Sequence, residues 1–306
     1  MKTNETYLPL KRPSAGPFFK STLAEIYFTI YNHTLSLSDK IDYVKWDCNR
    51  QVMNVGSDYL GEEQSRFYVD YVQGLYKVLQ RIRKKFPEVL IQCCSSGGSR
   101  VDYGALRYCN EFWTSDDTDA LERVRIQYGT SMFYPAGVIG SHVSAVPNHQ
   151  TGNVTPLKFR FDVACSGRMG MEIQPKLLTK EERDLAARCI DSYKSYRELV
   201  FNGDLYRLLS PYDGNYYALM YVSADKKRAV AFVYCVNYLN RSVFAKPIRM
   251  QGLAPGQKYK VTELNVEKSC YNGSGKSFSG DYLMNGGFNP AMYKTYESAV
   301  FLLEAE

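Results

Sequence analysis

The stretch Ile41-Asp42-Tyr43-Val44-Lys45-Trp46-Asp47 predicts a buried β-strand that ends in polar side chains. A helical pattern follows, with apolar side chains four and three residues apart, and Pro87 ends it. Its apolar positions are Tyr68, Val72, Leu75, Leu79, Ile82 and Phe86. The run Val89-Leu90-Ile91-Gln92-Cys93 then predicts a second short buried strand. A strand, a helix and another strand in this order are typical of a parallel β/α unit.

The same alternation continues as far as about residue 210. Glu111-Phe112-Trp113 predicts a third strand, and the helix after it reaches Tyr128, with Gly129 as its C-cap. Two further strands are expected at residues 140–145 and 163–173. This part of the chain therefore predicts successive β/α units around a parallel sheet.

The pattern changes after one more helix, which begins with a capping box formed by Thr179 and Glu182. From about residue 211, short strands separated by clusters of Gly, Asn and Ser predict an antiparallel β-sandwich. Its predicted strands are 216–222, 229–236, 258–264 and 299–303. We therefore expect three parts: residues 1–40 without a clear pattern, a β/α domain over 41–210, and a C-terminal β-sandwich domain over 211–306.

The composition favours a folded globular chain that does not bind nucleic acid. Of the 306 residues, 45% are hydrophobic, which is enough for a sizeable core. The net charge of +6 is spread along the chain, and no basic stripe carries the interleaved aromatic residues of single-strand binders. The eight cysteines include no C-x-x-C pair and the three histidines form no cluster, so we expect no zinc site. Without a signal-like or membrane-spanning apolar run, a cytoplasmic protein with free thiols is expected.

Three polar loops follow three of the predicted strands, at the ends where β/α barrels hold their catalytic groups. The loops offer Lys45, Asp47 and Asn49, then Cys94-Ser95-Ser96-Gly97-Gly98, then Trp113, Asp116, Asp117 and Asp119. The only two tryptophans, Trp46 and Trp113, precede Asp47 by one residue and Asp116 by three. An indole beside a carboxylate can stack on a sugar ring and exclude water, so this pattern indicates a sugar site.

Glycoside hydrolysis needs two carboxyl groups in different environments, one ionised as a nucleophile and one protonated as an acid. Lys45 lies two residues before Asp47, so on a strand both side chains point the same way and the ammonium favours the ionised carboxylate. Asp117 and Asp119 lie close to Asp116, and their charges favour its protonated form. Two structural interpretations stay open beside catalysis. Lys-x-Asp can be a surface salt bridge, and Ser-Asp-Asp-Thr-Asp can be a helix N-terminus.

Three motifs resemble those of the family 36 α-galactosidases, in the family's order and spacing. Tyr43-Val44-Lys45-Trp46-Asp47-Cys48-Asn49-Arg50 resembles the nucleophile motif. Cys94-Ser95-Ser96-Gly97-Gly98-Ser99-Arg100 resembles the Cys-Ser-x-Gly-Gly loop, and Trp113-Thr114-Ser115-Asp116-Asp117-Thr118-Asp119 resembles the acid/base motif. Tyr128-Gly129-Thr130-Ser131 and residues 142–150 also match, so the resemblance covers roughly residues 41–304.

The resemblance implies a (β/α)8 TIM-type barrel with a C-terminal antiparallel β-sandwich. It implies hydrolysis of terminal α-linked galactose, as in oligosaccharides of the raffinose type, with retention of configuration. In that reaction Asp47 would be the nucleophile and Asp116 the general acid/base. The residues expected to bind the sugar are Lys45, Trp46, Cys48, Asn49, Cys94, Gly97 and Trp113. No cofactor or metal is implied, and the expected partner is an α-galactoside oligosaccharide rather than nucleic acid or a membrane.

Two departures from the family pattern lead to further expectations. Gln92-Cys93 stands where the family usually carries Glu-Ser. The family's nucleophile ends the fourth barrel strand, and residues 1–41 are too few for three β/α repeats of roughly 30 residues each. We therefore expect barrel strands 4 to 8 only, in a truncated form that is unstable or inactive alone, with a homo-oligomer left open for the full-length form. The alternatives are an α-galactosyltransferase, an α-N-acetylgalactosaminidase, or an inactive remnant that acts as a carbohydrate-binding or structural module.

Overall fold

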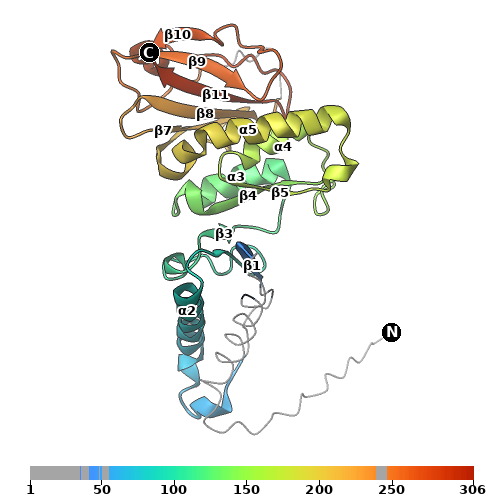
Figure 1. Cartoon of the computed structure of the whole chain (residues 1–306), viewed down its shortest axis with the longest axis vertical. Helices are drawn as coiled ribbons and strands as arrows, with labels where there is room; N and C mark the ends of the chain where they lie inside the picture. Colours follow the sequence, from blue (N-terminus) through green and yellow to red (C-terminus); the bar gives the residue numbers. More distant parts are fainter. Residues whose placement is uncertain (1–34, 36–40, 48, 50–54, 239–246) are drawn as a thin grey trace. The chain divides into compact units, whose positions relative to one another are not determined.

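The structure is a computed structural model that describes residues 35, 41–47, 49, 55–238 and 247–306 (Figure 1). The chain divides into two compact units. The first unit consists of Met1–Ser95 and Arg100–Asn110, and the second unit consists of Ser96–Ser99 and Glu111–Glu306. Each unit is described by itself below.

The first unit holds one parallel β/α/β unit, as predicted. Strand β1 (Tyr43–Asp47) pairs in parallel with β2 (Leu90–Cys94), and helix α2 (Phe67–Lys85) connects them. Short 3-10 turns lie at Asp58–Leu60, Gln64–Arg66 and Ala105–Arg107. The predicted apolar face of α2 is buried only toward its end, where Leu79 and Ile82 are each 2% exposed.

A single arginine ties the last turn of α2 to the chain around β2. The guanidinium of Arg83 donates hydrogen bonds to the carbonyl oxygens of Val89 (2.6 Å) and Tyr108 (2.7 Å) and to Asn110 Oδ1 (2.6 Å). Asn110 Oδ1 also accepts from the backbone N–H of Ile91 at 3.0 Å. These bonds hold the helix against the segment that carries the second predicted sugar loop.

The second unit continues the parallel β/α pattern before the chain enters an antiparallel sheet. Its first three strands are parallel neighbours, in the order β3 (Glu111–Trp113), β4 (Ile139–Ser144) and β5 (Arg168–Glu172). The helices of this part are α3 (Ala120–Thr130), α4 (Leu157–Ala164) and α5 (Lys180–Asn202), with 3-10 turns at Ala136–Val138 and Pro175–Leu177. The capping box of Thr179 and Glu182 at the start of α5 is confirmed.

Two local predictions in this part were wrong. Residues 163–173 are not one strand, because Val163 and Ala164 end α4 and β5 begins only at Arg168. Every residue of α4 but one is buried, so the helix has no polar face from which its period could be recognised. Gly129 is not a C-cap but lies inside α3, which ends at Thr130 with Ser131 in the capping position.

The rest of the second unit is antiparallel, as predicted. Its described strands form one six-stranded sheet in the order β10-β9-β11-β8-β7-β6. The strands are β6 (Asp204–Leu209), β7 (Tyr216–Val222), β8 (Arg228–Cys235), β9 (Lys258–Leu264), β10 (Lys276–Ser279) and β11 (Ser298–Ala305), with helix α6 (Gly280–Asn285) after β10. Strands β7 and β9 have the bounds predicted for them, whereas β6 and β10 were not predicted.

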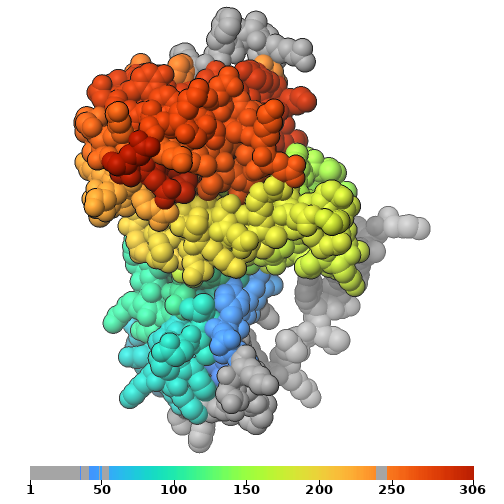
Figure 2. All heavy atoms as spheres, turned by 45° about the horizontal axis from the view of Figure 1, so that its top comes forward, coloured from blue at the N-terminus to red at the C-terminus, as the bar shows by residue number. Residues whose placement is uncertain are grey.

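Both faces of the antiparallel sheet are covered, so its central strands are buried along nearly their whole length. On one face Tyr196 and Val200 of α5 pack with Phe232 and Tyr234 of β8, and Figure 1 shows α5 lying along that face. Phe288 and other side chains from the loops and α6 cover the opposite face. Figure 2 shows α5, in yellow, packed along this module, in orange and red. In the described part of the chain, no helix combines the length and apolar character of a membrane span.

Candidate active site

The end of β1 in the first unit groups four of the predicted site residues. Lys45 and Asp47 are exposed and two residues apart on the strand, so they share a face, while Trp46 between them is 5% exposed. Asn49 donates a hydrogen bond from Nδ2 to Asp47 Oδ2 at 3.0 Å. Cys94, the last residue of β2, is the register partner of Asp47 and is buried. An exposed carboxylate therefore stands at the carboxyl end of β1, oriented by an amide.

The loop after β3 in the second unit carries the other predicted carboxyl group. Ser115 Oγ accepts from the N–H of Asp117 at 3.0 Å, and Asp117 Oδ1 accepts from the N–H of Asp119 at 3.0 Å. Asp119 is buried and caps α3 by accepting from the N–H of Leu121 at 2.8 Å; its other oxygen accepts from the Thr151 hydroxyl. The helix N-terminus interpretation of this loop is therefore correct for Asp117 and Asp119.

Asp116 differs from its two acidic neighbours. Its side chain is exposed, and its carboxylate forms no hydrogen bond or ion pair with the described residues. Because the folding of the loop uses the carboxylates of Asp117 and Asp119 but not that of Asp116, Asp116 is the one available to act on a ligand. The role of Asp116 as general acid/base stays a prediction.

Gly97 belongs to the second unit and lies against this loop. Its φ is +78°, in the left-handed region, and a Cβ placed on it would lie 2.8 Å from Ser115 Cα and 3.0 Å from the backbone nitrogen of Asp116. Because position 97 has no side chain, the backbone around Gly97 can approach the loop after β3 closely, at the Ser115–Asp116 peptide. The predicted role of Gly97 beside the sugar stays a prediction.

We expect Gly97→Ala to destabilise the second unit more than a glycine replacement that meets only backbone strain. Gly214 is the matched control, because its φ of +100° is also positive but nothing lies within 4 Å of a Cβ there. Gly214→Ala should cost about 1 kcal/mol from the left-handed conformation. Gly97→Ala should cost about 1–3 kcal/mol more, from overpacking against Ser115. Urea denaturation measures the free energy of unfolding of both variants. Equal losses would show that the close approach of Gly97 to Ser115 adds nothing to the cost of the substitution.

Trp113, the last residue of β3, is surrounded by groups that the sequence did not predict. Its ring centroid lies 4.6 Å from that of His142, and His142 Nδ1 lies 3.1 Å from Glu172 Oε1. The guanidinium of Arg123 lies 5.1 Å from the Trp113 ring. His142 begins the matching segment 142–150, whereas Arg123 and Glu172 carried no motif or spacing signal that could have identified them.

The predicted site residues are divided between the two units. Asp47, Lys45, Trp46, Asn49 and Cys94 lie in the first unit, and Cys48 lies outside the described residues. Gly97, Trp113 and Asp116 lie in the second unit. Retention of configuration requires the two carboxyl groups to lie about 5–5.5 Å apart.

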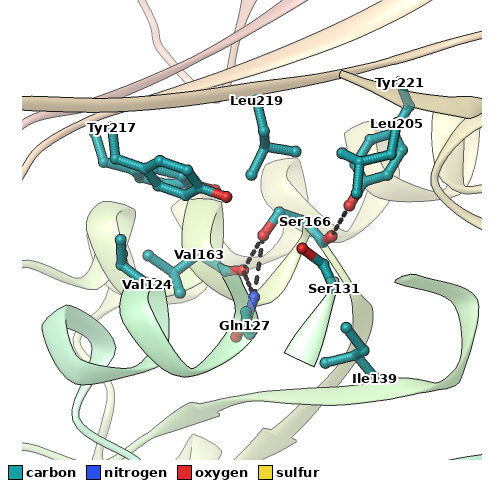
Figure 3. Close-up of a pocket in the computed structure, with 11 residues that line it drawn as sticks. Val124, Gln127, Ser131, Ile139, Val163, Ser166, Leu205, Tyr217, Leu219 and Tyr221 are labelled. Carbon is teal, nitrogen blue, oxygen red and sulfur yellow. Dashed lines mark hydrogen bonds between the residues drawn. The ribbon is translucent and has the colours of Figure 1, made fainter. Parts of the chain in front are cut away.

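A separate pocket lies within the second unit, between α3, α4 and the antiparallel sheet (Figure 3). Gln127 Nε2 donates to Ser166 Oγ (3.1 Å) and to the Val163 carbonyl (3.3 Å), and the Tyr221 hydroxyl donates to the Ser166 carbonyl (2.8 Å). The space has room for about one water molecule and is far too small for a sugar. In the described part of the chain, no group of three or more His, Cys, Asp or Glu side chains could hold a metal ion.

Comparisons with known proteins agree with this fold and these motifs. Residues 19–203 match the melibiase family model, and residues 216–303 match the C-terminal domain of glycosyl hydrolase family 36. Both matches are to families of glycosyl hydrolases. The chain belongs to family 36, the family of the melibiases.

The relatives are α-galactosidases that are longer than this chain. α-Galactosidase AgaA of Geobacillus stearothermophilus is 43% identical over 252 residues, which cover 82% of this chain and 33% of AgaA. The bifunctional α-galactosidase/sucrose kinase AgaSK of Mediterraneibacter gnavus is 39% identical over 264 residues, or 86% of this chain and 26% of AgaSK. The chain spans about a third of the length of the curated relatives it matches.

The solved structure of AgaA confirms the predicted fold class. It superposes with a TM-score of 0.86 over 98% of this chain and 41% of AgaA, at 36% identity. The parallel strands of this chain therefore correspond to part of the TIM-type barrel of a family 36 enzyme. The antiparallel sheet corresponds to the C-terminal β domain of that enzyme. Other similar structures are AgaA variants in complex with raffinose and with stachyose.

Proposed function

We propose that the chain forms part of a retaining exo-α-galactosidase that hydrolyses terminal α-linked galactose from oligosaccharides of the raffinose type. The observation that carries the proposal is an exposed aspartate at the carboxyl end of a parallel strand in each unit: Asp47 ends β1 in the first, and Asp116 lies in the loop after β3 in the second. Family 36 membership and relatives named as α-galactosidases support it. AgaA complexes with raffinose and stachyose support the substrate class.

In the proposed reaction Asp47 attacks the anomeric carbon while Asp116 protonates the departing glycosidic oxygen. Asp116 then takes a proton from water, which attacks the galactosyl–Asp47 ester and releases galactose with its original configuration. The Asn49 amide holds one oxygen of Asp47, which leaves the other free to form the new bond. The two carboxyl groups supply both the nucleophile and the acid, so the proposed reaction uses no cofactor.

The remaining predicted residues would bind the sugar around these two groups. Lys45 shares the face of Asp47 and would contact galactose hydroxyls together with Asn49. Cys94 and Gly97 would border the sugar's 2-position, and Trp113 would form a wall of the pocket. The contributions proposed for Trp46 and Cys48 follow from the family motif alone.

We also propose a reducing, cytoplasmic location. Six cysteines of the described part support it, because they are free thiols even where two of them lie close together. They are Cys93, Cys109, Cys165, Cys189, Cys235 and Cys270.

The stereochemistry of hydrolysis tests the proposed function. The chain is incubated with an aryl α-galactoside, and proton NMR follows the first sugar released before it mutarotates. α-Galactose as the first product supports a retaining enzyme with two close carboxyl groups. β-Galactose would show inversion, which requires carboxyl groups about 6.5–9.5 Å apart, and would overturn the assignment of Asp47 as nucleophile.

The same assay separates the enzymatic alternatives. Transfer of galactose to a sugar acceptor in preference to water would indicate an α-galactosyltransferase. Faster turnover of the corresponding aryl N-acetyl-α-galactosaminide would indicate an α-N-acetylgalactosaminidase. A folded chain that binds galactose but releases no product from either substrate would support the inactive remnant.

A further inference from the structure

Arg123 is a deeply buried cationic side chain near the proposed acid/base. It lies on the first turns of α3 and is 2% exposed. Burial lowers the pKa of its guanidinium to about 10, against the charges of Glu172 and Asp117, which raise it. The group is therefore still a cation at neutral pH.

Arg123 donates hydrogen bonds to the backbone next to Asp116 and to the neighbouring strand β4. The guanidinium donates to the Ser115 carbonyl oxygen at 3.3 Å, one residue before Asp116, and to the Gly140 carbonyl oxygen on β4. It lies 5.1 Å from the ring of Trp113, at the end of β3. One side chain thus joins the last residue of β3, the peptide before Asp116 and the neighbouring strand.

Stability alone does not explain this arrangement. In the described part of the chain, the hydrogen-bond acceptors of Arg123 are carbonyl and amide oxygens rather than carboxylates. Burying a cation without an ion pair is expensive, and an apolar side chain of similar volume would fill the same space at lower cost. A planar donor with several fixed N–H directions is instead suited to holding separate backbone segments at set positions.

We propose that Arg123 is a positioning residue that holds the Ser115–Asp116 peptide against β4 and Trp113, so that the Asp116 carboxyl group points at the glycosidic oxygen. The proposal rests on the proposed function of Asp116. Its chemical consequence is specific: displacement of the loop impairs proton donation to the leaving group, while attack by Asp47 is untouched.

Leaving groups of different acidity test this consequence. Dinitrophenolate departs without protonation, whereas phenolate needs the general acid. We expect Arg123→Lys, which keeps the charge but loses the planar donor, to lower kcat/KM for phenyl α-galactoside by about 10²-fold. Its kcat/KM for the dinitrophenyl substrate should fall only a few-fold. Asp116→Ala, measured alongside, gives the difference between the two losses of kcat/KM that is expected when the acid is absent.

Arg125 supplies the matched control. It lies on the same helix, two residues further on, and its guanidinium pairs with Glu122 at 2.9 Å at the half-exposed surface. Arg125→Lys should leave both substrates unaffected. If Arg123→Lys lowers kcat/KM by the same factor for both substrates, or for neither, the proposed positioning role is wrong.

Hydrogen exchange gives a second test that needs no activity. The amides of Asp117 and Asp119 donate within the loop, so their exchange reports its order. In Arg123→Met they should exchange about tenfold faster or more, with the amides of α5 unchanged. Unchanged loop exchange, or equal acceleration in α5, would overturn the proposal. If the wild-type chain hydrolyses neither substrate, the isolated chain lacks the proposed activity, and the exchange result by itself decides the role of Arg123.

Discussion

Replacing Asp47 by alanine is expected to lower kcat for aryl α-galactosides by about 10⁴–10⁶-fold, the range seen when an enzyme loses its nucleophile. The loss should be similar for good and poor leaving groups, because no covalent intermediate can form with either. This pattern distinguishes Asp47 from Asp116, whose removal should spare kcat/KM for the dinitrophenyl substrate, because formation of the galactosyl–Asp47 ester from it needs no general acid.

Asp42 is the matched control for Asp47. It is an exposed aspartate immediately before β1, whereas Asp47 is the last residue of that strand. Catalytic groups of β/α barrels lie at the carboxyl ends of the strands, so Asp42→Ala should keep full activity. Equal loss in both variants would point to damage to β1 rather than to lost chemistry.

Azide identifies which carboxyl group has been removed. In Asp47→Ala, azide should enter from the vacated side of the sugar and give β-galactosyl azide, which restores part of the activity. In Asp116→Ala, azide should instead attack the galactosyl–Asp47 ester and give α-galactosyl azide. α-Galactosyl azide from Asp47→Ala would show that Asp47 is the acid/base and Asp116 the nucleophile.

The sequence predicted regular elements best where one face is polar or the ends are marked. Strand β9 alternates between buried and exposed residues, and α5 begins with its Thr179 capping box, so both were predicted. Helix α4 was missed because packing surrounds it, and β10 because it is a four-residue edge strand. Tertiary contacts decide these elements, and a local pattern does not contain them.

The same distinction applies to the site. The motif around Ser115 contains three aspartates, and only the folded loop shows that the carboxylates of Asp117 and Asp119 accept hydrogen bonds from backbone N–H groups. Arg123 was not predicted, because an arginine in a polar helix pattern is normally solvated and burial is a property of the fold. Family resemblance therefore predicted the two reacting groups, whereas the buried side chains around them required the structure.

Asp162→Ala is expected to destabilise the second unit strongly. Asp162 lies in α4 and is fully buried. Its Oδ2 accepts from Lys158 Nζ and from Ser298 Oγ, both at 2.6 Å, and its Oδ1 accepts from Asn265 Nδ2 at 2.7 Å. Ser298 begins β11 and Asn265 follows β9, so this carboxylate joins the β/α part to the antiparallel sheet.

Alanine would leave the Lys158 ammonium without its carboxylate and two buried donors without their acceptor. Breaking a buried pair from one side costs about 3–5 kcal/mol, which is a large part of the stability of a typical domain. Asparagine keeps the shape and one acceptor but loses the charge, so Asp162→Asn should lose roughly 1.5–3 kcal/mol. Urea denaturation followed by circular dichroism measures both.

Lys180 and Asp184 on α5 provide a closely matched control for the Lys158–Asp162 pair. They repeat the Lys158–Asp162 pair in residue types, in spacing and in N–O distance (2.7 Å against 2.6 Å), but their side chains are 77% and 59% exposed. Water screens an exposed pair and solvates the partner that is left. Asp184→Ala should therefore leave the denaturation midpoint unchanged within error. If Asp162→Ala also leaves it unchanged, the buried carboxylate does not join the two parts of the unit. If both variants are strongly destabilised, loss of an i, i+4 helix pair rather than burial explains the effect.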